Sequence, residues 1–226
     1  MNNADFNAYK SKFRTAIRKV LSESESGRLD EAAFPAYSHP NPFINWLFWQ
    51  RLRKTMEYIE GGAPYQRVLD FGCGSGVLLP SLGKLADQVT AADVDLIPFE
   101  RMKTVIDFPS NIEVCDLHTF SLDQLPAASF DIITALDVLE HVDDLSGTLK
   151  NLLRLLKPGG RLIVSGPTEN IFYRLGRRVA GREYTGNYHE RGIAEIKHQL
   201  ASVAHIEQIA VLYWPLPLFD LFSAIL

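Results

Sequence analysis

Three glycines at alternate positions, Gly72, Gly74 and Gly76, are the residues whose spacing points most directly to chemistry. They follow residues 68–71, an apolar run that includes the carboxylate Asp70. Glycines at this spacing let the backbone turn sharply and approach a ligand without interference from a Cβ atom. They also let free N–H groups point at polar ligand atoms where a helix begins. The segment therefore predicts a strand that ends in a loop for a small-molecule ligand.

A second strand is predicted at residues 88–93, after the helix that follows the glycines, and it ends in Asp93. An acidic side chain at this place can bind the two hydroxyls of a ribose. The two strands and their helix make one βαβ half-site. Its G-x-G-x-G spacing differs from the G-x-G-x-x-G of dinucleotide folds, which makes a nicotinamide dehydrogenase the weaker hypothesis.

The chain resembles the class I S-adenosylmethionine-dependent methyltransferases over about residues 65–166. The features that carry the resemblance occur in the family's order: residues 68–76, Asp93, residues 111–117 with Asp116, residues 129–142, and residues 155–164. The resemblance implies a doubly wound α/β fold with a mostly parallel, Rossmann-like sheet of the seven-stranded type and extra N-terminal helices. It also implies S-adenosylmethionine as the cofactor.

The resemblance assigns roles to the cofactor-binding candidates. The glycine backbone would border the methionine part, Asp70 would order the loop or meet the amino group through water, and Asp93 would bind the ribose. Asp116 and the Leu117 N–H would address the adenine edge. For the last two acids the alternative is an ordinary capping or turn carboxylate. The full predicted set is Asp70, Gly72, Cys73, Gly74, Gly76, Asp93, Val94, Asp116, Leu117 and Leu136.

Apolar periodicity extends the pattern along the chain. Alternating helices and strands predict a parallel sheet covered on both faces. We expect an amphipathic helix up to Leu21 and helices at residues 43–59, 77–85, 98–106, 145–156, 170–180 and 190–202. We expect strands at residues 88–93, 111–115, 130–135, 161–165 and 206–212, and a tail at 218–226 that is a strand or a short helix. Residues 1–62 would form an N-terminal helical cap and 63–226 the core, with 167–200 as an acceptor lid.

Composition narrows the class of protein. The 226 residues and a hydrophobic content of 46% suit one compact core, and a net charge of −4 gives no pull toward nucleic acid. Cys73 and Cys115 are the only cysteines and have neither disulfide nor metal-site spacing, so both are expected to be reduced. The N-terminus lacks a signal peptide or spanning helix, which predicts a cytoplasmic protein with at most peripheral membrane contact. The oligomeric state stays open.

Catalysis would need mostly the positioning of an acceptor against the sulfonium methyl, with a base only when the acceptor carries a proton. The candidate catalytic residues are His141 and His189, because an imidazole titrates near neutrality. The alternative for His141 is a role in shaping the cofactor pocket. No metal is expected, although Asp137, Glu140 and His141 resemble the metal-assisted pattern of quinone-biosynthesis O-methyltransferases, with Asp137 where a longer Glu occurs in that pattern.

The acceptor side is predicted from two aromatic segments. Tyr173, Tyr188 and Arg191 are substrate-binding candidates, the last for an anionic group; the alternative is an ordinary polar surface. Trp46 and Trp49 either pack their helix on the core or line the mouth of an apolar pocket. We expect methyl transfer to a small-molecule or lipid-like acceptor, at oxygen. The alternatives are N- or C-methylation of another metabolite and a non-catalytic cofactor-binding regulator.

Overall fold

The computed structural model describes residues 2–23, 34–168, 192–212 and 217–226. Its α-helices are α1 (Asn3–Glu23), α2 (Phe34–Ser38), α3 (Pro42–Glu60), α4 (Leu79–Leu85), α5 (Ile97–Lys103), α6 (Leu145–Leu155) and α8 (Ile193–Ala201). Short 3-10 helices are η1 (Leu122–Gln124) and η2 (Leu139–His141). The strands are β1 (Tyr65–Phe71), β2 (Ala86–Asp93), β3 (Ile112–Asp116), β4 (Phe130–Leu136), β5 (Leu156–Pro167), β6 (His205–Leu212) and β7 (Phe219–Ile225).

The strands form one seven-stranded sheet in the order β3-β2-β1-β4-β5-β7-β6. β1 to β5 pair in parallel, and β7 is antiparallel to both of its neighbours, β5 and β6. The strand order reverses between β1 and β4, and ligands of such sheets bind outside the carboxyl ends at this switch point. The predicted doubly wound, Rossmann-like fold is confirmed.

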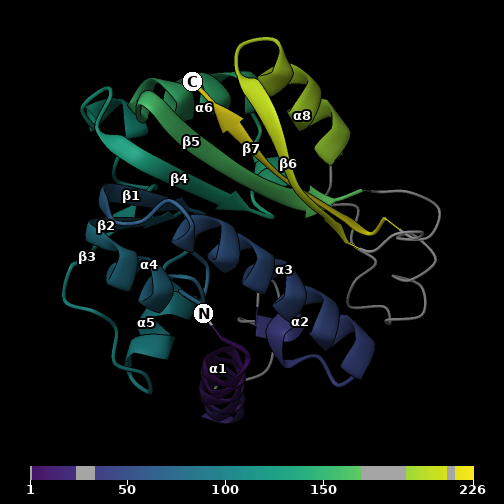
Figure 1. Ribbon diagram of the computed structural model, residues 1–226. Helices are drawn as coiled ribbons and strands as arrows, with labels where there is room; N and C mark the ends of the chain where they lie inside the picture. Colours follow the sequence, from purple (N-terminus) through teal and green to yellow (C-terminus); the bar gives the residue numbers. More distant parts are fainter. Residues whose placement is uncertain (1, 24–33, 169–191, 213–216) are drawn as a thin grey trace.

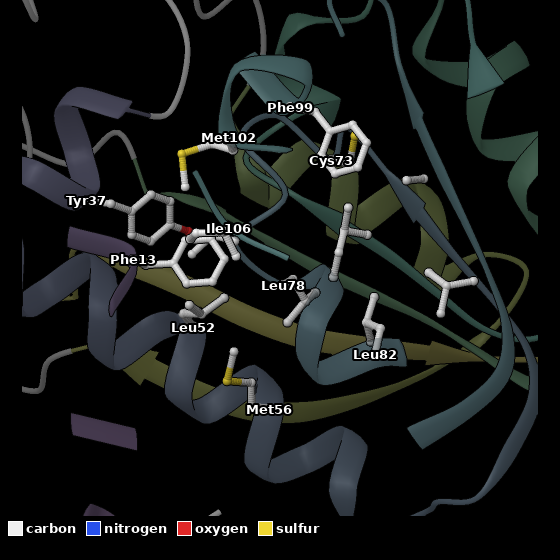
Figure 2. Close-up of a cluster of buried hydrophobic side chains, with 14 of the residues drawn as sticks. Phe13, Tyr37, Leu52, Met56, Cys73, Leu78, Leu82, Phe99, Met102 and Ile106 are labelled. Atoms are coloured by element: carbon white, nitrogen blue, oxygen red, sulfur yellow. The ribbon is translucent and has the colours of Figure 1, made fainter. Parts of the chain in front are cut away.

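Helices cover both faces of the sheet (Figure 1): α6 and α8 lie on one face, and α3 and α4 on the other. The pleat divides each strand between two cores, so that Val68 joins the core beneath α3 and α4 while Leu69 joins that beneath α6 and α8. Figure 2 shows the first core, to which Phe13 of α1, Met56 of α3 and Phe99 of α5 all contribute. The N-terminal helices thus share a core with the sheet.

Helix α3 begins after Asn41, whose side chain accepts two backbone N–H groups of the first turn, and Pro42 stands at its start. Both residues favour a helix start here, because the cap satisfies orphan donors and proline presets φ. Leu47, Arg51 and Thr55 follow at intervals of four and are all buried. A charged residue therefore lies on the inward face of this helix.

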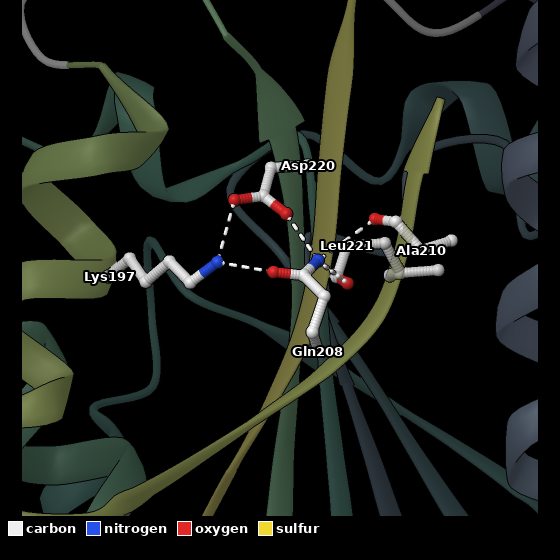
Figure 3. Close-up of polar contacts among 5 residues, drawn as sticks. All are labelled: Lys197, Gln208, Ala210, Asp220 and Leu221. Carbon is white, nitrogen blue, oxygen red and sulfur yellow. Dashed lines mark hydrogen bonds and ion pairs between the residues drawn. The ribbon is translucent and has the colours of Figure 1, made fainter. Parts of the chain in front are cut away.

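A polar cluster fastens α8 to the hairpin of β6 and β7 (Figure 3). Lys197 donates to the Asp220 carboxylate (3.0 Å) and to the side-chain oxygen of Gln208 (2.5 Å). The Gln208 amide donates to Asp220 (2.6 Å) and to the carbonyl oxygens of Ala210 (3.1 Å) and Leu221 (2.9 Å). The β6–β7 register shifts between Gln208 and Ala210, so Gln208 satisfies carbonyl groups at an irregularity in the ladder.

Most predicted elements are confirmed within a few residues. The undecided tail is strand β7, which buries Phe219, Leu221 and Phe222 between two partner strands. β5 is longer than predicted, and the helix expected at 170–180 lies outside the described residues. Across the described parts of the chain, no helix has the length and apolar character needed to cross a membrane.

Candidate functional site

The carboxyl ends of β1, β2 and β3 lie side by side at one edge of the sheet. In the parallel register Asp93 of β2 pairs with Asp116 of β3. The glycine loop, residues 72–76, leaves β1 at the same edge, where the Gly72 N–H donates to the Ala92 carbonyl oxygen (2.8 Å). The structure therefore brings the predicted loop and both predicted nucleoside-side carboxylates together.

The conformation of the loop requires glycine. Gly72, Gly74 and Gly76 have φ angles of 78°, 51° and 74°, in the left-handed region that other residues rarely adopt. A Cβ atom on Gly72 would lie 2.6 Å from the Val138 side chain, and one on Gly76 would lie 2.8 Å from the Phe99 ring. The glycines provide the sharp turn and close approach expected from their spacing.

Asp93 ties this loop to β2. Its Oδ2 accepts the Gly74 N–H at 2.7 Å, and its Oδ1 accepts the Asp95 N–H at 3.1 Å. Burial raises the pKa of the Asp93 carboxyl, although these N–H groups oppose the shift. Each carboxylate oxygen keeps a second lone pair, so the side chain can hold the loop and still accept from a ribose hydroxyl.

The adenine-side candidates differ in what they offer. The Asp116 carboxylate accepts the His118 N–H (2.8 Å) in a turn, which agrees with the alternative that Asp116 is an ordinary turn carboxylate. The Leu117 N–H donates to the Asp93 carbonyl oxygen (2.9 Å) and so is engaged within the sheet rather than directed to a ligand. Val94 is 55% exposed beside the Asp93 carboxylate, and Leu136 is half-buried at the end of β4. For Val94, Asp116 and Leu136 the ligand contacts stay predictions.

Asp70 is a buried carboxyl one residue before the end of β1, and only 4% of it is exposed. Burial raises its pKa to about 7, Asp93 pushes in the same direction, and the hydrogen bond from the Thr134 hydroxyl (2.7 Å) opposes both. Its carboxyl therefore titrates near neutrality inside the site. A nearby cationic group of a ligand would favour the ionised form.

Two loop side chains add to the site. Cys73 is free and buried, and burial raises the pKa of its thiol well above the ordinary value, with Asp70 and Asp93 adding to the shift. Ser75 is 1% exposed, and its hydroxyl has no hydrogen-bond partner among the described residues. A buried hydroxyl without a partner in a glycine loop is a place for a ligand contact. Sequence reasoning did not single out Ser75, although its position between Gly74 and Gly76 could have indicated it.

Arg51 is a buried, charged residue paired with Asp137 at the end of β4, and sequence reasoning missed it. It is 2% exposed and forms an ion pair with Asp137, and its guanidinium donates to the Tyr37 hydroxyl at 3.2 Å. Its guanidinium carbon also lies 4.9 Å and 5.1 Å from the ring centroids of Phe48 and Phe219. The pattern that could have indicated Arg51 is a charged residue at helical spacing between the inward-facing positions Leu47 and Thr55 of α3. Its role depends on a partner distant in sequence.

The profile of the methyltransferase domain family matches residues 26–214 of this chain, which include the glycine loop, Asp93 and Asp116. The chain belongs to the class I S-adenosylmethionine-dependent methyltransferases.

Curated relatives of this methyltransferase include proteins named ubiquinone biosynthesis O-methyltransferase. The one from Xanthomonas oryzae pv. oryzae (strain PXO99A) is 37% identical over 138 residues, 58% of this chain and 55% of that protein. The one from Xanthomonas euvesicatoria pv. vesicatoria (strain 85-10) is 39% identical over 104 residues, 44% of this chain and 42% of that protein. The chain thus spans about half the length of the curated relatives it matches.

Solved structures support the same fold. The N-methyltransferase NodS from Bradyrhizobium japonicum WM9, in complex with S-adenosyl-L-homocysteine, is 20% identical, has a TM-score of 0.58, and covers 93% of this chain and 96% of its own. The magnesium protoporphyrin IX methyltransferase from Synechocystis PCC 6803 is 16% identical, has a TM-score of 0.59, and covers 100% of this chain and 99% of its own. At these identities the likeness shows the fold.

The catalytic candidates of the methyltransferase follow β4. His141 ends η2 and is exposed, whereas Glu140 is buried at 3% exposure. Asp137 has a φ of 55°, pairs with Arg51 and accepts from the Ser165 hydroxyl (3.2 Å). This engagement of Asp137 directs it away from the role of base or metal ligand. Within the described ranges no group of three His, Cys, Asp or Glu side chains could hold a metal ion.

The structure describes only some of the residues predicted to lie on the acceptor side. Tyr173, Tyr188, His189 and Arg191 lie outside the described residues. The two tryptophans separate: Trp49 is fully buried and its indole N–H donates to the Tyr37 carbonyl oxygen (3.1 Å), while Trp46 is 38% exposed and lies against Phe43, their ring centroids 5.9 Å apart. Core packing is therefore confirmed for Trp49.

Proposed function

We propose that this methyltransferase transfers the methyl group of S-adenosylmethionine to an oxygen of a small, quinol-like acceptor. The observation that carries the proposal is the junction of the left-handed glycine loop with Asp93, through the bond from the Gly74 N–H to the Asp93 carboxylate (2.7 Å). The name of the curated relatives supports oxygen as the attacked atom.

The described residues fit the cofactor. The left-handed glycines let the loop backbone approach a ligand closely. Among the described residues, the Ser75 hydroxyl and the Nε of the buried Arg51 have no hydrogen-bond partner. Asp70 would face the amino group of the methionine part, and Asp93 the ribose. Arg51 would favour the carboxylate, since Val138, the neighbour of its partner Asp137, packs against the loop. When bound, the cofactor supplies an electrophilic sulfonium methyl group.

The protein's own contribution to the chemistry is positioning and proton removal. An in-line displacement at a methyl carbon gains mostly from holding the acceptor oxygen in line. A phenolic hydroxyl must also lose its proton, and we assign this step to Nε2 or Nδ1 of His141, the last residue of the short helix η2 that follows β4. His189 stays the second candidate for this role.

A quinol-like acceptor would also favour a particular location of the protein in the cell. Such acceptors are apolar and partition into membranes, so we propose a cytoplasmic protein with peripheral membrane contact. The neighbouring rings of Phe43 (56% exposed) and Trp46 (38% exposed) on the first turns of α3 suit this contact.

The test is methyl transfer from methyl-tritiated S-adenosylmethionine to three acceptor classes: a catechol-type quinol, an amine and a carbon acid. We expect label in the quinol alone, on oxygen. We expect His141→Gln to lower kcat by about 100-fold while leaving the KM for the cofactor unchanged. Label only in the amine or the carbon acid would contradict O-methylation and indicate nitrogen or carbon as the attacked atom. Cofactor binding without methylation of any acceptor would favour the hypothesis of a non-catalytic regulator.

A further inference from the structure

We propose that helix α1 positions the cofactor loop, acting through the hydroxyl of Tyr9. This inference rests on the proposed function, because it assigns a binding role to an element that precedes the glycine loop by about fifty residues. Tyr9 is here a positioning residue: it holds the backbone that binds the ligand.

The first observation is a hydrogen bond across 68 residues of sequence. The Tyr9 hydroxyl donates to the carbonyl oxygen of Val77, the residue directly after Gly76. Val77 is 7% exposed and the bond is part-buried, so the carbonyl would be poorly hydrated without this donor, which is costly. The bond therefore fixes the peptide at which the loop turns into α4.

The second observation is a chain of aromatic contacts that reaches the same loop. Tyr9 lies against Phe13 (4.9 Å between ring centroids), Phe13 against Phe108 (6.4 Å), and Phe108 against Phe99 (4.9 Å). Phe99 is the side chain that a Cβ atom on Gly76 would meet at 2.8 Å. Figure 2 shows Phe13 and Phe99 in one cluster with Leu78, which follows the loop. α1 thus bonds directly to the residue after the loop and reaches the Phe99 ring beside Gly76 through Phe108.

The hydroxyl is suited to act as a permanent donor. Burial raises the pKa of Tyr9. A hydrogen bond with Ser81 opposes this shift, while the charges of Tyr37 and Asp70 add to it, and the net rise keeps the proton on the oxygen at any ordinary pH. A loop held in its bound conformation before the ligand arrives pays less ordering entropy on binding.

The test compares Tyr9→Phe with Tyr65→Phe. Tyr65 is a matched control, because its hydroxyl also donates to a main-chain carbonyl, that of Ile59 (2.7 Å), but at the amino end of β1. We expect the two variants to lose similar thermal stability. Only Tyr9→Phe should weaken S-adenosyl-L-homocysteine binding, by about tenfold in calorimetry, and raise the KM for the methyl donor with little change in kcat. Amide hydrogen exchange across residues 72–79 should accelerate in Tyr9→Phe alone.

Unchanged exchange of residues 72–79 in Tyr9→Phe would overturn the inference, as would equal binding by wild type and Tyr9→Phe. If the wild type binds no S-adenosyl-L-homocysteine, the proposed function fails, and the exchange comparison still decides whether α1 positions the loop.

Discussion

Asp70 makes the most specific prediction, and the perturbation is Asp70→Asn. Asparagine has nearly the same shape and keeps an oxygen that can accept the Thr134 hydroxyl now 2.7 Å from the carboxylate, but it cannot ionise. Burial, with a further contribution from Asp93, raises the pKa of Asp70 to about 7 from an ordinary 3.8. The variant therefore removes one titration and little else.

The sign and size of the effect follow from linkage. The folded state binds this proton more tightly than the unfolded chain, so the stabilisation by the protonated carboxyl is fully present below about pH 4. It is lost as the pH rises through about 7. Two-state linkage with these pKa values gives a loss of about 3 kcal/mol in the free energy of unfolding between pH 5 and pH 8.

The assay is urea unfolding of wild type and Asp70→Asn from pH 5 to pH 8, with the exposed Asp87→Asn as a control. We expect the wild type to lose about 3 kcal/mol more than Asp70→Asn over this range, and Asp87→Asn to follow the wild type. Parallel pH profiles of wild type and Asp70→Asn would refute a carboxyl that titrates near neutrality.

Other substitutions test the loop, the hairpin and a surface carboxylate. Gly72→Ala should cost about 2 kcal/mol or more and abolish S-adenosyl-L-homocysteine binding, because its Cβ would lie 2.6 Å from Val138; Gly61→Ala, whose nearest contact is 3.4 Å, should be nearly neutral in both assays. Gln208→Leu should lower stability by about 1–2 kcal/mol in urea, since it deprives two carbonyl groups of a donor; an unchanged midpoint would contradict this. Partial burial would raise the pKa of Asp131, but hydrogen bonds from Lys157 and two backbone N–H groups lower it overall. The ionised carboxylate therefore stabilises the folded state, and this stabilisation should be lost as the pH falls below 4. Asp131→Asn should make the free energy of unfolding depend less on pH in this acid range.

The cofactor half of the site could be predicted because its signals are local. Glycines at alternate positions predict a tight turn, and an acid at the end of the next strand predicts a carboxylate at the same edge of the sheet. The spacing therefore placed Gly72 and Asp93 together, while their contacts with the cofactor stay predictions. The parallel pairing of β1 to β5 follows from the alternation of helices and strands.

The missed residues depend on contacts between distant segments. Arg51 meets Asp137 across 86 positions, and Tyr9 meets Val77 across 68, so neither partner marks the other in the sequence. The Leu117 N–H was assigned to a ligand because the sequence did not reveal that β2 would accept it. The tail at residues 218–226 could not be assigned to strand or helix because two prolines precede it, while pairing with its two neighbouring strands decides the outcome.

The central claim is that the glycine loop and Asp93 together hold the nucleoside-bearing cofactor. The most direct test is a calorimetric titration of S-adenosyl-L-homocysteine into wild type and Asp93→Asn, with the exposed Asp95→Asn as a control. The account predicts saturable binding at one site, retained in Asp95→Asn and weakened at least tenfold in Asp93→Asn. Failure of the folded wild type to bind, or equal binding by Asp93→Asn, would contradict it.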